Sequence, residues 1–140
     1  MEKEVLVTVK GTLTDDLGDQ ETIELITPAR YFCRSADFYI VYHESELSGM
    51  AGTITTLKAE PSRVTLNRMG AQELKQIFEV GIPNRGNYVT PYGSMFCDVF
   101  PRKVEVDLTD IGGSINLEYE LALDRQPIGC QALSITVREV

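Results

Sequence analysis

Hydrophobic and polar residues alternate along most of this 140-residue chain, and the alternation has a period of two. In the first run Val5, Val7 and Val9 lie on one face, with Thr8 and Lys10 on the other. The same pattern recurs in three later runs, at residues 103–109, 115–124 and 133–138. One apolar and one polar face are typical of strands in an antiparallel sheet that covers a core on one side.

Turn-forming residues interrupt these runs at short, even intervals. The clearest turn signals lie at residues 15–19, 48–50, 60–62, 69–70, 83–87, 110–113 and 124–127. Counting the runs between them predicts nine or ten strands and no helix longer than a turn. Residues 70–78 carry apolar side chains at helical spacing, but the stretch is short, and we interpret it as a loop that enters a strand. Pro28 lies inside the second run and predicts that this strand is bent or split.

The pattern predicts an all-β fold, with a single closed antiparallel barrel of about eight to ten strands. Many short strands at even spacing indicate either a sandwich or an up-and-down barrel. We favour the barrel because closure removes exposed strand edges, and because the runs are half-buried along the whole chain. The length fits one domain, which we assign to residues 1–140.

The formal net charge of −8 argues against a nucleic-acid partner and against an anionic membrane surface. The 13 Lys and Arg residues are scattered, whereas phosphate binding needs them clustered. The apolar stretches fall far short of the ~20 residues that span a bilayer. The first residues enter a strand pattern directly, without the basic and apolar regions of a signal peptide. We therefore expect a soluble, cytoplasmic protein with no nucleic-acid or membrane partner.

The cysteines and the histidine give no sign of a metal or a cofactor. Cys33, Cys97 and Cys130 are widely spaced and form no C-x-x-C pair, so we expect reduced thiols that serve as small core residues. His43 is the single histidine, and its phase is opposite to that of Tyr42, so we expect it to face solvent. With no second histidine and no nearby cysteine, the sequence predicts no metal site and no cofactor.

The middle of the chain carries the most distinctive motifs. They are Tyr39-Ile-Val-Tyr42-His-Glu44, Val64-Thr-Leu-Asn-Arg68-Met-Gly70-Ala71, Phe78-Glu-Val-Gly81 and Tyr88-Val-Thr90-Pro91-Tyr92-Gly93. Their order and spacing, together with Asp15-Asp16 and the Tyr119 strand, resemble the YwiB-like family of bacterial proteins, a domain of unknown function. The resemblance implies a calycin-like (lipocalin-like) barrel in the bacterial cytoplasm. It implies no reaction, and small apolar ligands enter only by analogy with other calycin-like barrels.

Two strands end in a charged residue that continues an apolar face. Glu44 follows Tyr42 on the third strand, and Arg68 follows Leu66 on a later one. Because strands of a barrel alternate between inward and outward positions, such charges are expected at a barrel mouth, where they could form a charge-assisted pair. The residues that we assign to a candidate ligand site at this mouth are Tyr42, Glu44, Arg68, Tyr88, Tyr92 and Tyr119.

Each part of this candidate site also has a structural interpretation. The Glu44–Arg68 pair could simply close the end of the barrel, with the tyrosines as core residues whose hydroxyls reach water. Thr90-Pro91-Tyr92-Gly93 could be a lip that presents Tyr92 over the opening, or a plain hairpin turn. We favour the structural interpretation of both features.

Three functions are compatible with the sequence. The first is a barrel that binds a small, mostly apolar molecule whose polar end meets Glu44 and Arg68. The second is a filled barrel that acts as a scaffold or a homodimer through apolar residues of its outer face; the candidates are Leu6, Ile26, Phe32, Val41 and Ile77. The third, which we favour least, is an enzyme with Glu44 as general base and Asp98 as a second inward carboxylate. We assign no catalytic residue.

Overall fold

The computed structural model describes residues 2–140, which form mainly antiparallel strands. The strands are β1 (Glu2–Thr14), β2 (Gln20–Arg34), β3 (Asp37–His43), β4 (Thr53–Ala59), β5 (Arg63–Gly70), β6 (Leu74–Glu79), β7 (Asn84–Thr90), β8 (Gly93–Thr109), β9 (Gly112–Leu123) and β10 (Gln126–Glu139). A single turn of 3-10 helix, η1 (Glu46–Ser48), joins β3 to β4. The all-β prediction and the strand count are confirmed. Within residues 2–140 no helix has the length and apolar character needed to cross a bilayer.

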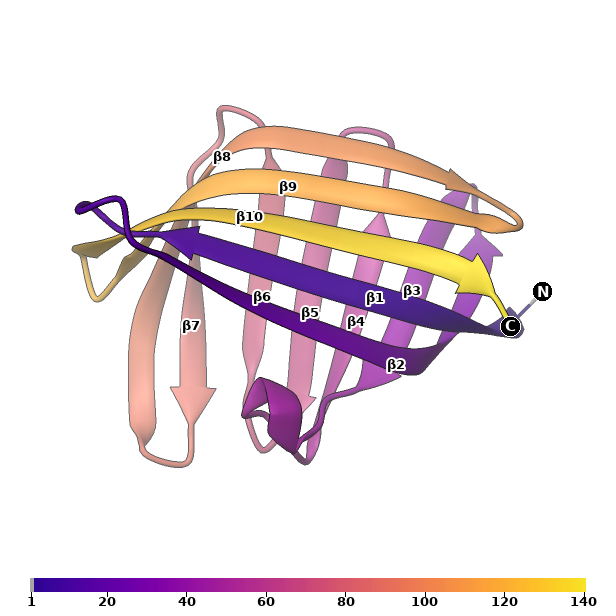
Figure 1. Cartoon of the computed structure of the whole chain (residues 1–140), viewed down its shortest axis with the longest axis horizontal. Coiled ribbons are helices and arrows are strands. Elements are labelled where there is room, and N and C mark those ends of the chain that lie inside the picture. Colours follow the sequence, from indigo (N-terminus) through magenta and orange to yellow (C-terminus); the bar gives the residue numbers. More distant parts are fainter. Residues whose placement is uncertain (1) are drawn as a thin grey trace.

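The strands form one antiparallel sheet in the order β6-β5-β4-β3-β2-β1-β10-β9-β8-β7. Neighbours in the sheet are neighbours in sequence, except that the first strand pairs with the last through the β1–β10 ladder. Figure 1 shows β1, β2, β8, β9 and β10 crossing in front of β3–β7, so the sheet curls over itself. The result is the nearly closed barrel that the alternating pattern predicted.

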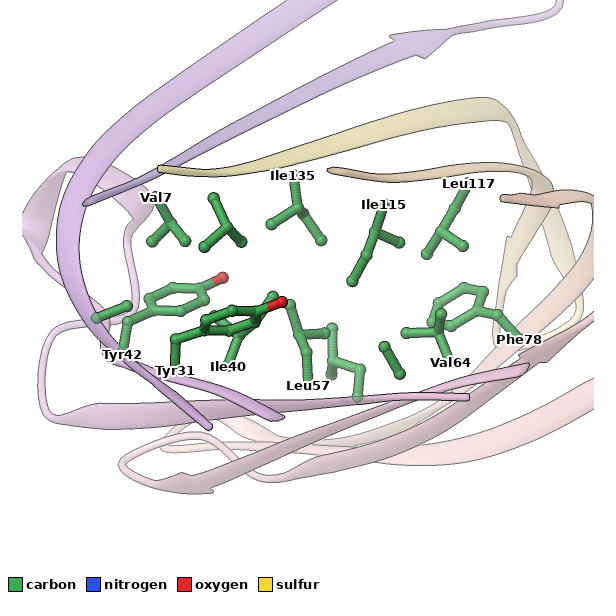
Figure 2. Close-up of a cluster of buried hydrophobic side chains, with 14 of the residues drawn as sticks. Val7, Tyr31, Ile40, Tyr42, Leu57, Val64, Phe78, Ile115, Leu117 and Ile135 are labelled. Atoms are coloured by element: carbon green, nitrogen blue, oxygen red, sulfur yellow. The ribbon is translucent and has the colours of Figure 1, made fainter. Parts of the chain in front are cut away.

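The core lies between these two layers. Figure 2 shows Val7, Ile115, Leu117 and Ile135 of β1, β9 and β10 facing side chains from β2–β6 across the interior. Every one of these four residues is buried. They belong to the alternating faces of the sequence, so period two was sufficient to identify this part of the core.

The barrel closes between β6 and β7 without a strand ladder. Glu73 and Val89 form one isolated bridge, in which each backbone N–H donates to the other residue's carbonyl at 2.9 Å. Further along, the Gln76 amide nitrogen donates to the carbonyl oxygen of Asn84 at 3.0 Å and to its Oδ1 at 2.9 Å. We call the line defined by Glu73, Gln76, Asn84 and Val89 the β6–β7 seam. Side-chain hydrogen bonds replace much of the backbone pairing there.

Two local predictions concern residues 70–78 and Pro28. Residues 70–78 form a short turn that enters β6 at Leu74, as expected. The second strand is not split, because β2 runs unbroken through Pro28, which lies opposite Leu6 of β1. Pairing with β3 begins only at Arg30, so Pro28 lies where the other edge of β2 carries no strand. A missing backbone N–H is tolerated at such an edge.

A β-bulge in β8 reverses which residues face the core. Pro101 lies opposite Tyr119 and Lys103 lies opposite Glu118, so Arg102 is one extra residue. After the bulge Val104 packs against the core, whereas before it Cys97 and Val99 do. Counting back by twos from Val104 would give the wrong face, since one inserted residue exchanges the two faces of a strand.

Candidate functional site

Glu44 and Arg68 are brought together, as predicted, with Thr55 between them. On three adjacent strands Tyr42, Thr55 and Arg68 lie directly opposite one another. The Glu44 side chain is 2% exposed, and its Oε2 lies 4.0 Å from Arg68 Nε. The Thr55 hydroxyl, which is fully buried, donates a short hydrogen bond to the same carboxylate oxygen. Thr55 is thus the hydrogen-bond partner of the buried carboxylate, and Arg68 is its charge partner.

Tyr42 packs beside this pair inside the core. Burial raises the pKa of its phenol well above the usual value, and the negative charge of Glu44 raises it further, while Arg68 acts in the opposite direction. Tyr42 is 4% exposed, and Figure 2 shows its ring among the apolar side chains. It therefore stays protonated and acts as a core residue.

A cavity of about 240 Å³ lies next to the pair, under β5–β10. Most of its wall is apolar. The lining residues are Leu66, Arg68, Leu74, Gln76, Phe78, Tyr88, Cys97, Val99, Tyr119, Leu121, Leu123, Gln131 and Leu133. An apolar cavity with a few polar groups is the usual form of a small-molecule site.

Two residues that line the cavity each contribute a buried polar atom with no hydrogen-bond partner among the described residues. The two atoms are Arg68 Nε and Gln76 Oε1. Arg68 Nε is too far from Glu44 for a hydrogen bond at 4.0 Å. An unsatisfied buried polar group costs ~1–3 kcal/mol. Gln76 Oε1 packs against Gly86, where an added Cβ would lie 2.8 Å from it.

The hydrogen bonds of Nε2 determine which way the Gln76 amide is turned. Besides its two hydrogen bonds to Asn84, Nε2 donates to the Cys97 carbonyl at 3.3 Å. Asn84 Oδ1 also accepts from the Ile77 backbone N–H at 2.9 Å. With three acceptors around the nitrogen, the amide oxygen is the atom left without a partner.

A larger hollow of about 520 Å³ opens near the chain ends, lined by Lys3, Tyr31, Phe32, Cys33, Phe38, Asp110 and Glu139. Its main polar groups already have partners. Lys3 Nζ pairs with Glu139 Oε2 at 3.1 Å, and the Tyr31 hydroxyl donates to the Thr109 carbonyl at 2.6 Å. The smaller cavity is therefore the better candidate, because its wall includes Arg68, which lies beside the buried Glu44.

Comparison with known proteins gives the family. The model for the domain of unknown function DUF1934 matches residues 7–135. The chain belongs to the DUF1934 family. It is 27% identical over 138 residues to the uncharacterized β-barrel protein YwiB of Bacillus subtilis, covering 97% of this chain and 95% of that protein. The crystal structure of YwiB from Bacillus subtilis superposes with a TM-score of 0.87 at 23% identity, over 99% of this chain and 93% of that one. The expected family is thus confirmed, and the barrel fold is shared.

Three of the six predicted site residues line the cavity of this DUF1934 domain: Arg68, Tyr88 and Tyr119. Burial raises the pKa of the Tyr119 phenol, and Arg68 partly offsets that rise. The Tyr88 hydroxyl donates a short hydrogen bond to Gln72 Oε1. Tyr42 and Glu44 lie beside the cavity but are not among its lining residues.

Tyr92 does not join the site. It is 98% exposed, at the tip of a two-residue hairpin turn in which Thr90 pairs with Gly93. The turn directs Tyr92 away from the sheet, as the hairpin interpretation of the Thr90–Gly93 motif predicts.

Asp98 was expected to face inward, and that prediction is wrong. The bulge at Arg102 places Asp98 on the outer face, where Arg85 forms a bidentate pair with it at 2.7 and 2.9 Å. The hydrogen bond from Arg85 lowers the pKa of Asp98. Phe96 shares the outer face and stacks under the Arg85 guanidinium. The second carboxylate that a glycosidase would need inside the barrel is therefore not Asp98.

The cysteine prediction is wrong for two of the three residues. Cys97 is buried on the cavity wall, but Cys33 and Cys130 are exposed. All three are free thiols. His43 is exposed, as its phase predicted. Within residues 2–140 no group of three His, Cys, Asp or Glu side chains is arranged to hold a metal ion.

Gln76 is the site residue that sequence reasoning missed. A glutamine is normally placed on the polar face of a strand, yet Gln76 is only 1% exposed. The signal was its phase, because Gln76 alternates with the inward residues Leu74 and Phe78. A polar residue at the centre of an apolar face indicates either a satisfied network or a site.

Proposed function

We propose that this protein binds a small, mostly apolar molecule inside its barrel. The observation that carries the proposal is an apolar cavity whose wall includes the Arg68 side chain, next to the buried carboxylate of Glu44. A ligand with one polar end would meet Arg68 and cover the apolar wall. The cavity, at about 240 Å³, is slightly smaller than the ~300–1,000 Å³ of sites for drug-sized molecules, so the ligand is small.

The cytoplasm is the compartment that we propose. Three free thiols, two of them exposed, suit a reducing environment, because exposed cysteines form disulfides where the surroundings are oxidising. The acidic net charge of −8 suits a protein that avoids phosphate-rich partners.

Native mass spectrometry of the protein purified from a bacterial host, followed by denaturing extraction, tests the binding proposal. We expect a small molecule to travel with the folded protein and to separate on denaturation. A Leu133→Phe variant fills the cavity and should reduce the bound fraction. Leu6→Phe makes the same change on the outer face and should leave it unchanged.

A ligand-free wild-type barrel would contradict the proposal and favour the scaffold interpretation. The same spectra count the protomers and so test the homodimer prediction. Of the five outer-face residues considered for that interface, Ile26 is 55% exposed, whereas Val41 is 9% exposed and therefore unavailable to a partner.

A further inference from the structure

Two strands of the barrel have a free edge over about half of their length. β2 pairs with β3 only from Arg30 onward, and β8 pairs with β7 only up to Val99. Within residues 2–140 no strand lies against the second edge of residues 20–29 or of residues 100–109. Figure 1 shows β2 and β8 as the two outermost strands of the front layer. We call these two segments the β2 edge and the β8 edge.

The β8 edge carries features that prevent pairing with another chain. Pro101 lacks a backbone N–H, and Arg102 is the extra residue of a bulge. Lys103, Glu105 and Asp107 follow, so charges of both signs alternate with the apolar residues. Proline, bulges and charged side chains are the usual means by which native proteins protect a free strand edge. The β8 edge is therefore protected.

The β2 edge is protected at one end only. Pro28 lacks a backbone N–H, but residues 22–27 read Thr-Ile-Glu-Leu-Ile-Thr, which favours an extended strand. Ile23 and Ile26 lie on opposite faces of this strand, and each is 55% exposed. The β2 edge thus combines a backbone that can pair with apolar side chains that lie in solvent, as strands that accept a partner do.

The hairpin between β2 and β3 indicates which backbone groups reach the β2 edge. Arg34 and Asp37 flank a two-residue turn, so they form a hydrogen-bonded pair. Because such pairs alternate along a strand, the even-numbered residues of β2 direct their backbone groups to that side. Thr22, Glu24 and Ile26 therefore present both N–H and C=O at the β2 edge, and no turn or loop within residues 2–140 pairs with them.

The surroundings of the β2 edge are acidic. Residues 11–29 contain five carboxylates and no lysine or arginine. Two of the carboxylates, Glu21 and Glu24, are exposed on the edge strand itself and lie on opposite faces. Each face therefore carries one carboxylate and one exposed isoleucine: Glu21 with Ile23, and Glu24 with Ile26. A strand with basic and apolar side chains is complementary to this pattern.

A second copy of this chain is a poor occupant of the same edge. Antiparallel pairing about a two-fold axis at Glu24 would place two carboxylates directly opposite each other, and neighbouring registers would still bring the two acidic segments together. Like charges at such positions destabilise a strand pair. Each chain also carries a net charge of −8, which opposes association. Charge complementarity therefore favours a basic partner.

We propose that the β2 edge binds an extended, basic segment of a partner protein as an added strand. The backbone of the segment pairs with the free N–H and C=O groups of the edge. Its lysine or arginine side chains meet Glu21 and Glu24, while its apolar side chains cover Ile23 and Ile26. No residue of the β2 edge lines the cavity under β5–β10, so this proposal does not depend on the cavity or its ligand.

A blocked peptide of three Val-Thr-Lys repeats is the probe. In an antiparallel strand opposite the β2 edge, this spacing places a lysine across from Glu21 and Glu24 and a valine across from Ile23 and Ile26. Binding is measured by titration at low salt, followed through the backbone amide resonances of the protein, since short strands bind weakly.

We expect the amides of Thr22, Glu24 and Ile26 to shift with the probe. The same peptide with glutamate in place of lysine should bind about ten-fold more weakly, because its charges oppose those of the edge. Added salt should weaken the lysine peptide, since the charges involved are exposed.

One pair of variants tests the contribution of charge. The double variant Glu21→Lys with Glu24→Lys should weaken binding of the lysine peptide about ten-fold. The matched control is Glu105→Lys with Asp107→Lys, which makes the same change of net charge at exposed positions of the β8 edge. This control should leave the affinity nearly unchanged.

A second pair of variants tests the backbone. Ile26→Pro removes an N–H from the β2 edge, where a proline is tolerated in a strand, and should abolish binding. Ile26→Thr removes the isoleucine but keeps the N–H, so it should retain most of the binding.

The outcomes decide the proposal independently of the cavity. Equal binding of the lysine and glutamate peptides, or equal effects of the two double variants, would show that the acidity of the β2 edge does not select its partner. If no β2 amide shifts, the edge is not a docking strand. If Ile26→Pro does not fold, the charge variants decide alone.

A second copy on the β2 edge would also overturn the proposal. It would appear as a dimer in native mass spectrometry, with β2 amides that shift on dilution in the absence of peptide. We expect a monomer whose β2 amides do not change with protein concentration.

Discussion

The buried carboxylate of Glu44 accepts a short hydrogen bond from Thr55. Thr55 donates to it, while Arg68 lies at 4.0 Å and makes no hydrogen bond to it. Replacing Thr55 by Val keeps the shape but removes the donor. A buried charged group that loses its partner costs ~1–3 kcal/mol or more, so we expect Thr55→Val to lower the free energy of unfolding by that amount.

Urea unfolding measures this loss of stability. Thr56→Val is the control, because it makes the same change at the next position, on the other face of β4. Thr56→Val should change the free energy of unfolding by less than about 0.5 kcal/mol. Equal effects of the two variants would mean that the Thr55 hydroxyl does not support Glu44.

The buried thiol of Cys97 is expected to reduce the stability of the barrel at alkaline pH. Burial raises the pKa of its thiol to about 11, from an ordinary value of 9.0. The unfolded chain therefore ionises first, so the stability contributed by Cys97 is complete below pH 9 and is lost between pH 9 and 11. We expect the wild type to lose up to roughly 3 kcal/mol more than Cys97→Ala over this window.

Thermal unfolding of both proteins from pH 8 to pH 11 checks this difference. The buried tyrosines Tyr42 and Tyr119 also have raised pKa values and destabilise both proteins at the upper end. Subtraction of the two curves isolates the thiol, and parallel curves would contradict the assignment.

The sequence identified single residues well where burial follows phase. His43 is exposed, and Glu44 and Arg68 meet, because each continues the face of the strand before it. Exposure at strand ends is not set by phase alone, which is why Cys33 was wrongly placed in the core. The hydrogen-bond partners of the Gln76 amide come from β7 and β8, which are distant in sequence. The local pattern around Gln76 therefore does not predict these hydrogen bonds.

At the level of the elements, the β6–β7 seam depends on a glycine. A Cβ atom at Gly86 would lie 2.7 Å from the Lys75 carbonyl oxygen and 2.8 Å from Gln76 Oε1. The carbonyl belongs to the backbone and cannot move aside cheaply. Gly86→Ala is expected to destabilise the barrel by roughly 1–3 kcal/mol.

Gly11→Ala is the control for this change. Its Cβ would approach Gln131 Nε2 at 2.7 Å, but that atom ends a flexible side chain. We expect a change of about 1 kcal/mol or less, measured by the same urea titration. If both glycines tolerate alanine equally, the seam is not tightly packed.

The strands themselves were predicted from the sequence, but the set of β8 residues that point inward was not. The one compositional sign of a bulge near Arg102 is Pro101, because a proline inside a strand lies at an edge or a bulge. The bulge appears only when β9 pairs with β8 and leaves Arg102 without an opposite residue. Asp98 was therefore placed on the wrong face, while the alternation of residues 103–109 was assigned correctly.

In the whole molecule, the loop of residues 80–83 holds β6 next to β7, where no strand ladder joins them. The ends of β1 and β10 are adjacent, with Val5 opposite Glu139, so a short linker could join them. A circular permutant reopened within residues 80–83 would remove the link across the seam. One reopened within residues 15–19 would cut a connection that the long β1–β2 ladder holds together.

Hydrogen exchange of the Glu73 and Val89 amides measures the difference between the permutants. Opening at 80–83 should make these two amides exchange much faster, whereas opening at 15–19 should leave them protected. Protection of both amides in both permutants would mean that the seam closes without the link.

The pairing of β1 with β10 also has a consequence for synthesis on the ribosome. β2 becomes available to β1 early, but the other edge of β1 finds its partner only when the last strand of the barrel has been translated. Until then the growing chain presents an open strand edge at β1, next to valines that are fully buried in the finished fold. Chaperones that bind nascent chains are therefore expected to protect β1, and stalled chains that lack β10 are expected to aggregate through this edge.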